Sequence, residues 1–316
     1  MRYALKKISI TMILLLIVSL ITFGIFQLLP GNPIEIILGV DADPGQVEAL
    51  RKQLGLDVSL PQRYLHWITN LLRGDMGNSL RYRMPVADML RRNLPVTVAL
   101  SVMSLTATIL LAVPISIYLA KNNRKKRAVF LSSLSQIGVA IPSFWLGVML
   151  IMLFAVILGW LPSSEFVPFS VNPMEAVKSL ILPSAAISAG TVAIVVRYLK
   201  NTLLDQLSLN YVRTAKSKGM TENRILYKHV LKNALLPTIT ILGMIVSDIL
   251  GGSIIVENVF SLPGIGTLLT AGVGNRDFIL VQGLTFYFAF TVIMINLAVD
   301  LLSMMIDPRI STNKGK

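Results

Sequence analysis

The sequence contains no cysteine, and its 316 residues include only two histidines, His66 and His229. Without cysteine, neither a disulfide framework nor a thiolate metal site can form. Two histidines far apart in the chain supply too few ligands for a zinc site. Charge is scarce as well: 14% of the residues are charged and 54% are hydrophobic, whereas about 25% charged residues is typical of a soluble domain. These shortages predict a membrane protein without a metal site.

Catalytic and nucleotide-binding motifs are also missing. The sequence holds no His-Glu-x-x-His, no pair of catalytic carboxylates, no Ser-His-Asp set and no Gly-x4-Gly-Lys-[Ser/Thr] phosphate loop. We therefore expect a chain that is not an enzyme, binds no cofactor and does not hydrolyse ATP by itself. A membrane-embedded enzyme would need a catalytic cluster near the membrane surface, and the sequence shows none.

Long runs without charge predict an all-α integral membrane protein with six transmembrane helices. A helix needs about 20 apolar residues to cross the hydrocarbon core. We expect spans at residues 8–29, 93–120, 136–160, 179–198, 236–257 and 278–299. The first run exceeds the apolar core of a signal peptide and lacks a small-residue cleavage site, so we expect a retained span. Pro142 predicts a kink or a restart within the third span.

Basic residues are distributed unevenly between the predicted loops. With the N-terminus inside, the segments 1–7, 121–127, 197–235 and 300–316 carry 19 Lys and Arg, and the outer segments carry 10. This asymmetry predicts an N-in, C-in orientation. The run at 121–127 has five basic residues in seven, and between two spans it is expected to anchor the inner side rather than to bind nucleic acid.

The chain is expected to have three regions: 1–29 with the first span, 30–92 as an extracytoplasmic helical cap, and 93–316 as a five-helix core. Within the cap, proline and glycine positions predict two short helices, Pro44–Leu54 and Pro61–Leu72. The second has an apolar face with Trp67 beside it, and that face comprises Tyr64, Leu65, Ile68 and Leu72.

A basic stretch at residues 208–237 interrupts the apolar spans and must leave the bilayer. We expect a short helix from Tyr211 to Lys218, a break at Gly219 and a second helix that opens at Thr221. Two pairs of residues in the second helix are four apart and give it a partly apolar face: Ile225 with His229, and Leu226 with Val230. Such a face suits the groove of a partner protein. The alternative is a basic loop held by anionic lipid headgroups.

The same stretch resembles the cytoplasmic coupling loop of ABC importer permeases, whose pattern is Glu-Ala-Ala, three residues, Gly, nine residues and Ile-x-Leu-Pro. The positions that match are Ala215, Gly219 and Leu231, and those that depart are Arg213, Thr214, His229 and Lys232. The longer string YVRTAKSKGM…HVLKNALLP resembles the dipeptide, oligopeptide and nickel branch. Further strings of that branch are LGLD (54–57), GDMGNS (74–79), ENVFSLPG (257–264), NRDF (275–278) and DPRI (307–310).

This resemblance implies the type I ABC importer permease fold and a multi-pass protein in the cytoplasmic membrane of a bacterium or archaeon. Implied partners are a second permease subunit, two ATP-binding subunits that use ATP and Mg²⁺, and an extracytoplasmic solute-binding protein. Peptides or nickel and other metal chelates would cross by alternating access. The implied coupling loop lies at 201–235, and its site residues are Tyr211, Arg213, Thr214, Ala215, Lys218, Gly219, Leu226, His229, Val230 and Leu231. The alternative is a secondary transporter, for which inverted repeats and ion-coupling acids would be expected.

Three polar residues are candidates for the translocation path. Asp248 is the acid placed well inside a predicted span, where acids are costly and often functional. It would line the path, or else bond to a polar side chain on a neighbouring helix or lie near a wide aqueous cavity. Glu257 and Asn258 would lie at the mouth of the path or cap the helix end. The glycines at 243, 251 and 252 predict close helix packing or a bend.

Overall fold

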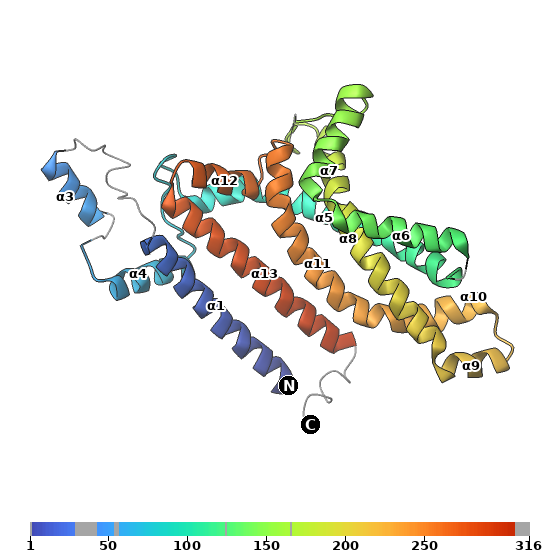
Figure 1. The fold of residues 1–316 in the computed structure, drawn as a ribbon. Coiled ribbons are helices and arrows are strands. Elements are labelled where there is room, and N and C mark those ends of the chain that lie inside the picture. Colours follow the sequence, from blue (N-terminus) through green and yellow to red (C-terminus); the bar gives the residue numbers. More distant parts are fainter. Residues whose placement is uncertain (1, 29–42, 54–56, 124, 165, 307–316) are drawn as a thin grey trace. The chain divides into compact units, whose positions relative to one another are not determined.

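In a computed structural model, residues 2–28, 43–53, 57–123, 125–164 and 166–306 are described, and this part of the chain is helical with connecting turns (Figure 1). The chain divides into two compact units, residues 1–95 with 263–294 and residues 96–262 with 295–316. Among the described residues, five helices are long and apolar enough to cross a membrane, and a bent pair makes a sixth. The prediction of an all-α chain with six apolar spans is confirmed at this level.

The first unit contains the short helices of the predicted cap. Its elements are α1 (Arg2–Leu28), α3 (Pro44–Gln53), α4 (Leu60–Leu72), α12 (Ile265–Gly274) and the beginnings of α5 (Val86–Lys121) and α13 (Phe278–Ile306). The two cap helices match the prediction, apart from Leu54, which lies outside the described residues. Helix α12 was not predicted, because its ten residues are too few for a span. Helix α5 begins earlier than the predicted span at 93, so residues 86–92 are helical as well.

Helix α4 packs on α1 through aromatic side chains. The hydroxyls of Ser19 and Tyr64 are 2.8 Å apart, and the ring of Tyr64 lies 5.4 Å from that of Phe23. Trp67 contacts Phe286 of α13 edge to face, with ring centroids 5.7 Å apart. Leu65 and Leu72, by contrast, are exposed. Of the predicted apolar face, Tyr64 makes contacts together with the adjoining Trp67, and the two leucines do not pack within this unit.

The second unit contains the remaining helices. These are α6 (Lys126–Ala140), α7 (Ser143–Leu150) with a π-helical segment (Ile151–Ile157), α8 (Pro173–Ser208), α9 (Asn210–Ser217), α10 (Glu222–Ile225), a π-helical segment (Leu226–Val230) and α11 (Leu231–Val259). Their core is formed by fully buried side chains, including Leu100, Leu180, Ile245, Ile249 and Phe260.

The predicted third span, 136–160, is not one continuous helix. Helices α6 and α7 meet at an angle of 101° across the break at residues 141 and 142. Pro142 lacks a backbone N–H and adopts an extended conformation before α7. The restart expected at Pro142 is confirmed, and helix α6 begins earlier than the expected span, at Lys126.

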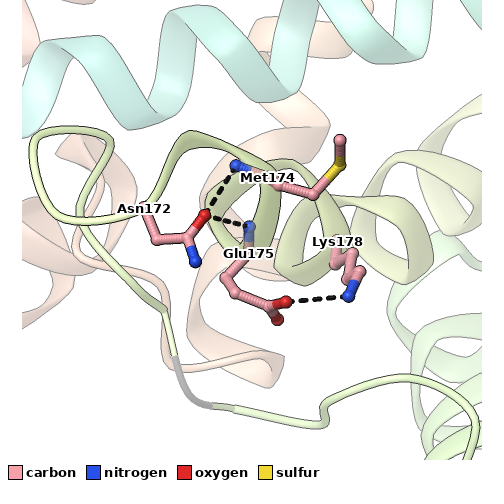
Figure 2. A network of polar contacts seen from close by, with 4 residues as sticks. All are labelled: Asn172, Met174, Glu175 and Lys178. Atoms are coloured by element: carbon pink, nitrogen blue, oxygen red, sulfur yellow. Dashed lines mark hydrogen bonds and ion pairs between the residues drawn. The ribbon is translucent and has the colours of Figure 1, made fainter.

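Helix α8 begins at a polar cap that the sequence analysis placed outside the fourth span. The side-chain oxygen of Asn172 accepts hydrogen bonds from the backbone N–H groups of Met174 (3.1 Å) and Glu175 (3.3 Å), and Glu175 pairs with Lys178 at 2.7 Å (Figure 2). Asparagine at this position satisfies free N–H groups of the first turn, and Pro173 fits the first helical position. The helix therefore starts at residue 173 rather than 179.

Small residues bring helices of the second unit close together. A β-carbon on Gly138 of α6 would lie 3.1 Å from the carbonyl oxygen of Ala189 in α8. A β-carbon on Gly243 of α11 would overlap the side chain of Val299 in α13. The close packing predicted for glycines is thus found at Gly243, whereas Gly251 and Gly252 face open space.

Candidate functional site: the basic segment and the polar residues of α11

The basic segment, defined as residues 210–231, begins where α8 ends and continues into α11. Helix α9 closes with two backbone hydrogen bonds, from Gly219 N–H to Lys216 O (2.9 Å) and from Met220 N–H to Ala215 O (3.2 Å). This is the Schellman arrangement, which requires a left-handed residue, and Gly219 has φ +77°. The predicted helix, glycine break and second helix from Thr221 are confirmed. Thr221 holds the N-cap position without a side-chain cap.

The apolar side of the basic segment is buried within this chain. Val212, Ile225, Leu226 and Val230 join a cluster with Leu199 and Leu203 of α8 and with Ile117 and Ala120 of α5. Leu226 and Val230 are 4% and 0% exposed. Contrary to the prediction, these side chains do not present a surface to a partner's groove. They fix the segment onto the ends of α5 and α8.

The polar side of the basic segment is exposed. Arg213, Thr214, Lys218 and Gly219 lie on this surface. Lys216 pairs with Glu222 at 3.2 Å across the turn. At α10, Asn223 accepts a hydrogen bond from Lys121 Nζ at 2.9 Å. With five Lys and Arg and one acid between residues 210 and 231, the segment presents a cationic surface on a defined backbone.

The remaining predicted residues of the segment are partly covered. Tyr211 donates a hydrogen bond from its hydroxyl to Gln206 Oε1 at 3.0 Å. Ala215, His229 and Leu231 are half-buried. The sequence analysis did not include Arg224 and Tyr227, both of which are exposed. The signal was available, because in the helical period both residues lie on the side opposite the apolar positions 225, 226 and 230.

Asp248 lies on the exposed side of α11. The alternative of a polar partner on a neighbouring helix is not found among the described residues. Next to it, the hydroxyl of Ser247 is buried and has no hydrogen-bond partner within the same part of the chain. An exposed carboxylate on an apolar helix can receive a cation or a hydrogen-bond donor.

Glu257 and Asn258 are adjacent in sequence but lie in different environments. Glu257 is fully buried, and its carboxylate accepts a hydrogen bond from the Thr97 hydroxyl of α5 at 2.7 Å. Asn258 is exposed and donates to the carbonyl oxygen of Ile254 in its own helix. In this unit Glu257 thus joins α11 to α5, and the sequence alone did not reveal that contact.

Two strings singled out in the sequence, GDMGNS and NRDF, meet in the first unit. The buried carboxylate of Asp277 accepts hydrogen bonds from the Ser79 hydroxyl, the N–H groups of Leu80 (3.2 Å) and Arg81 (3.1 Å), and the N–H of Leu280 at the start of α13 (3.1 Å). We call residues 77–86 the braced loop. Close packing adds to this brace, since a β-carbon on Gly77 would lie 2.8 Å from Ile279.

Metal ligands are not gathered anywhere in the described ranges, where no group of three or more His, Asp and Glu side chains is placed to hold a metal ion. The exposed groups of the site are cations, a carboxylate and hydroxyls. They can dock a protein or bind a polar solute.

Relatives of the chain are membrane components of transport systems. A protein of Brucella suis biovar 1 (strain 1330), named for a peptide transport system permease, is 36% identical over 306 residues, covering 97% of this chain and 98% of that protein. The oligopeptide transport system permease protein AppB of Bacillus subtilis is 34% identical over 311 residues, covering 98% of each chain. The glutathione transport system permease protein GsiC of Salmonella typhimurium is 35% identical over 310 residues, covering 98% of this chain and 99% of the relative.

The fold is similar to a chain of the MetNI methionine ABC transporter, solved in inward-facing conformations. That similarity has a TM-score of 0.58 at 18% identity and covers 69% of this chain and 96% of the other. It confirms the predicted type I importer fold. Two family models match the sequence, the binding-protein-dependent transport system inner membrane component over residues 112–312 and its N-terminal region over residues 1–101. The alternative of a secondary transporter is therefore not favoured, and the chain belongs to the family of inner membrane components of binding-protein-dependent transport systems, as a permease subunit of an ABC importer.

Proposed function

We propose that the basic segment of this permease subunit is a docking surface for the ATP-binding subunits. Two ATP-binding subunits would serve this chain and a second permease subunit together. The observation that carries the proposal is the two-sided construction of the segment. Its apolar side is buried against α5 and α8, and its cationic side is exposed. When a partner bound to this surface moves, the segment can transmit the displacement to α5 and α8, against which it packs. ATP and Mg²⁺ would be bound by the partner chains.

The helix that follows the segment provides the route for this motion. From Glu222 to Val259 the chain is helical without a break, over 38 residues. A displacement at α10 therefore moves α11, which carries Asp248. We propose that α11 tilts with the neighbouring helices and opens the path alternately to the two sides, as in other transporters that move rigid bundles.

The orientation proposed is N-in and C-in. The unequal distribution of Lys and Arg supports it. The basic segment is then cytoplasmic, and the cap helices α3 and α4 lie outside. Protease added to the outer side of intact spheroplasts should cut within residues 57–85. Cleavage there only after the membrane is opened would contradict this orientation.

Peptides are the proposed substrates, delivered by an extracytoplasmic solute-binding protein. The relatives described above are named for peptide, oligopeptide and glutathione transport, which favours peptides over nickel chelates. Asp248 is proposed to meet the cationic amino group of the substrate. The variant Asp248→Asn should lower the uptake of labelled dipeptides severalfold and leave ATP hydrolysis in place. Unchanged uptake would remove Asp248 from the path.

The docking role is tested by reversing exposed charges. In Arg213→Glu with Lys218→Glu, the ATP-binding subunits should no longer co-purify with the permease, and uptake should be lost. The matched control reverses Arg91 and Arg92, two adjacent exposed cations at the start of α5. The proposal would be contradicted if both double variants lost the ATP-binding subunits equally, or if both retained them.

Gly219 gives a second test of coupling. Proline has φ near −65°, so Gly219→Pro removes the left-handed turn between α9 and α10. ATP hydrolysis by the purified complex should then continue without peptide uptake in proteoliposomes. Normal uptake by this variant would show that the geometry of the turn does not matter for coupling.

A further inference from the structure

A cavity of about 450 Å³, wide open to the surface, lies between the last turn of α5 and the first turns of α6. It is lined by Tyr118, Lys126, Arg127, Phe130 and Leu131. This volume falls within the roughly 300–1,000 Å³ of small-molecule sites. The lining has two parts: two cations at the start of α6, and an apolar wall of aromatic and aliphatic side chains. A ligand that matches both parts must be amphiphilic and anionic.

The cations of this cavity are not neutralised within the described part of the chain. Neither Lys126 nor Arg127 forms a salt bridge there, and both are exposed. The neighbouring Lys121 is engaged with Asn223, and Lys200 donates to the Ser132 hydroxyl at 2.9 Å. The sequence from residue 121 to residue 127 contains no acid. Positive charge therefore accumulates at one end of the cavity, where an anionic group gains from it.

The apolar wall continues beyond the cavity along α6. Phe130 is 71% exposed, and Leu134 and Ile137 follow it at helical spacing on the same exposed face. On α5, Leu110, Leu111 and Tyr118 are exposed as well. Both helices are candidates to cross the bilayer. The acyl chains of lipids would cover an exposed apolar face on such helices. The cavity lies where this apolar face meets the basic run at residues 121–127.

We propose that the cavity binds one anionic phospholipid. Its phosphate lies between Lys126 and Arg127, and an acyl chain follows Phe130 toward Leu134. Basic pockets between membrane helices recognise anionic headgroups in this way, and long basic side chains at helix ends reach the interface while their stems cover apolar surface. Free phosphate would satisfy the two cations only, and a zwitterionic lipid would satisfy the apolar wall without supplying net charge. The inference does not depend on the docking role proposed for the basic segment.

Lipid retention measured by native mass spectrometry tests this site. The purified transporter complex is titrated with dioleoylphosphatidylglycerol, dioleoylphosphatidylcholine or inorganic phosphate. We expect phosphatidylglycerol to be retained at least tenfold more tightly than phosphatidylcholine. In Lys126→Gln with Arg127→Gln this preference should fall roughly tenfold, since each cation near the surface contributes to binding of anionic lipid. Phe130→Ser should weaken retention of phosphatidylglycerol as well.

The control pair is Arg91→Gln with Arg92→Gln, two adjacent exposed cations at the other end of α5. An equal loss in the control pair would overturn the site in favour of general charge attraction. Displacement of the lipid by inorganic phosphate would show a simple anion site, and equal retention of both lipids would show an apolar groove alone. A photo-crosslinker at position 130 should label lipid in native membranes. Labelling of a protein chain instead would assign this face to a partner subunit and overturn the proposal.

Discussion

The braced loop and the basic segment both present exposed cations, yet different forces hold them in place. In the braced loop, one buried carboxylate, that of Asp277, accepts hydrogen bonds from a side chain and three backbone N–H groups. In the basic segment, several buried apolar side chains pack against α5 and α8 and hold the segment in place, whereas the ion pair across its turn is exposed. A fold held by one polar group depends on that group, whereas a fold held by many apolar contacts loses a part with each substitution.

The largest effect is expected at the brace. Asp277→Ala leaves the Ser79 hydroxyl and three backbone N–H groups without the carboxylate that accepts their hydrogen bonds. Unsatisfied buried donors cost about 1–3 kcal/mol each, so we expect the free energy of unfolding to fall by about 3 kcal/mol or more. A denaturant titration in detergent micelles measures this loss.

The matched control for the brace is Asp88→Ala. Asp88 pairs with Arg91 at 3.5 Å on the surface, and exposed ion pairs contribute at most about 1 kcal/mol. If the two alanine variants lose similar stability, then Asp277 does not organise the braced loop, and the contrast with the basic segment disappears.

The second effect is expected at the turn of the basic segment. Gly219 has φ +77° and open space around its α-carbon. Gly219→Ala places a β-carbon in a left-handed conformation, which costs about 1–2 kcal/mol. Gly251 of α11 also has open space but an ordinary helical φ, so Gly251→Ala should stabilise by up to about 1 kcal/mol. If thermal unfolding shows a lower melting temperature for Gly219→Ala and a higher one for Gly251→Ala, then the backbone angle, rather than the available space, requires glycine at position 219.

Much of the secondary structure followed from the sequence because single residue types determine it. Uncharged runs predicted the apolar helices, Gly219 predicted the turn and Pro142 predicted the restart. Helix ends were predicted less well. Asn172 caps α8 seven residues before the predicted start of the fourth span, and charged residues such as Asp88 continue α5 beyond the apolar run.

The candidate site was predicted in position but not in detail, since burial depends on contacts distant in the chain. The spacing of Leu226 and Val230 indicated an apolar face correctly. Only the packing of Leu199 and Leu203 against that face shows that this chain covers it. The contact of Glu257 with Thr97 joins residues 160 positions apart, and no local pattern predicts such a pair.

A smaller effect is expected within the buried cluster of the basic segment. Ile225 is 1% exposed, and Ile225→Val removes one methylene from it. Such a change costs about 0.5–1.5 kcal/mol in a packed core. The same substitution at Ile255, which is 53% exposed, should change the unfolding free energy in detergent by much less. Equal losses at the two positions would indicate that the cluster does not support the segment.

The smallest effect is expected at the ion pair between Lys216 and Glu222. Both side chains are more than half exposed, so water and salt screen their attraction. Glu222→Gln should change the free energy of unfolding by less than about 0.5 kcal/mol. The substitution also removes the acid from a cationic surface, so it should tighten binding of an acidic partner while leaving stability unchanged. Thermal unfolding and the salt dependence of ATP-binding-subunit retention, measured on the same sample, separate the two effects. A large loss of stability in this variant would mean that an exposed charge holds the turn, as a buried charge holds the braced loop.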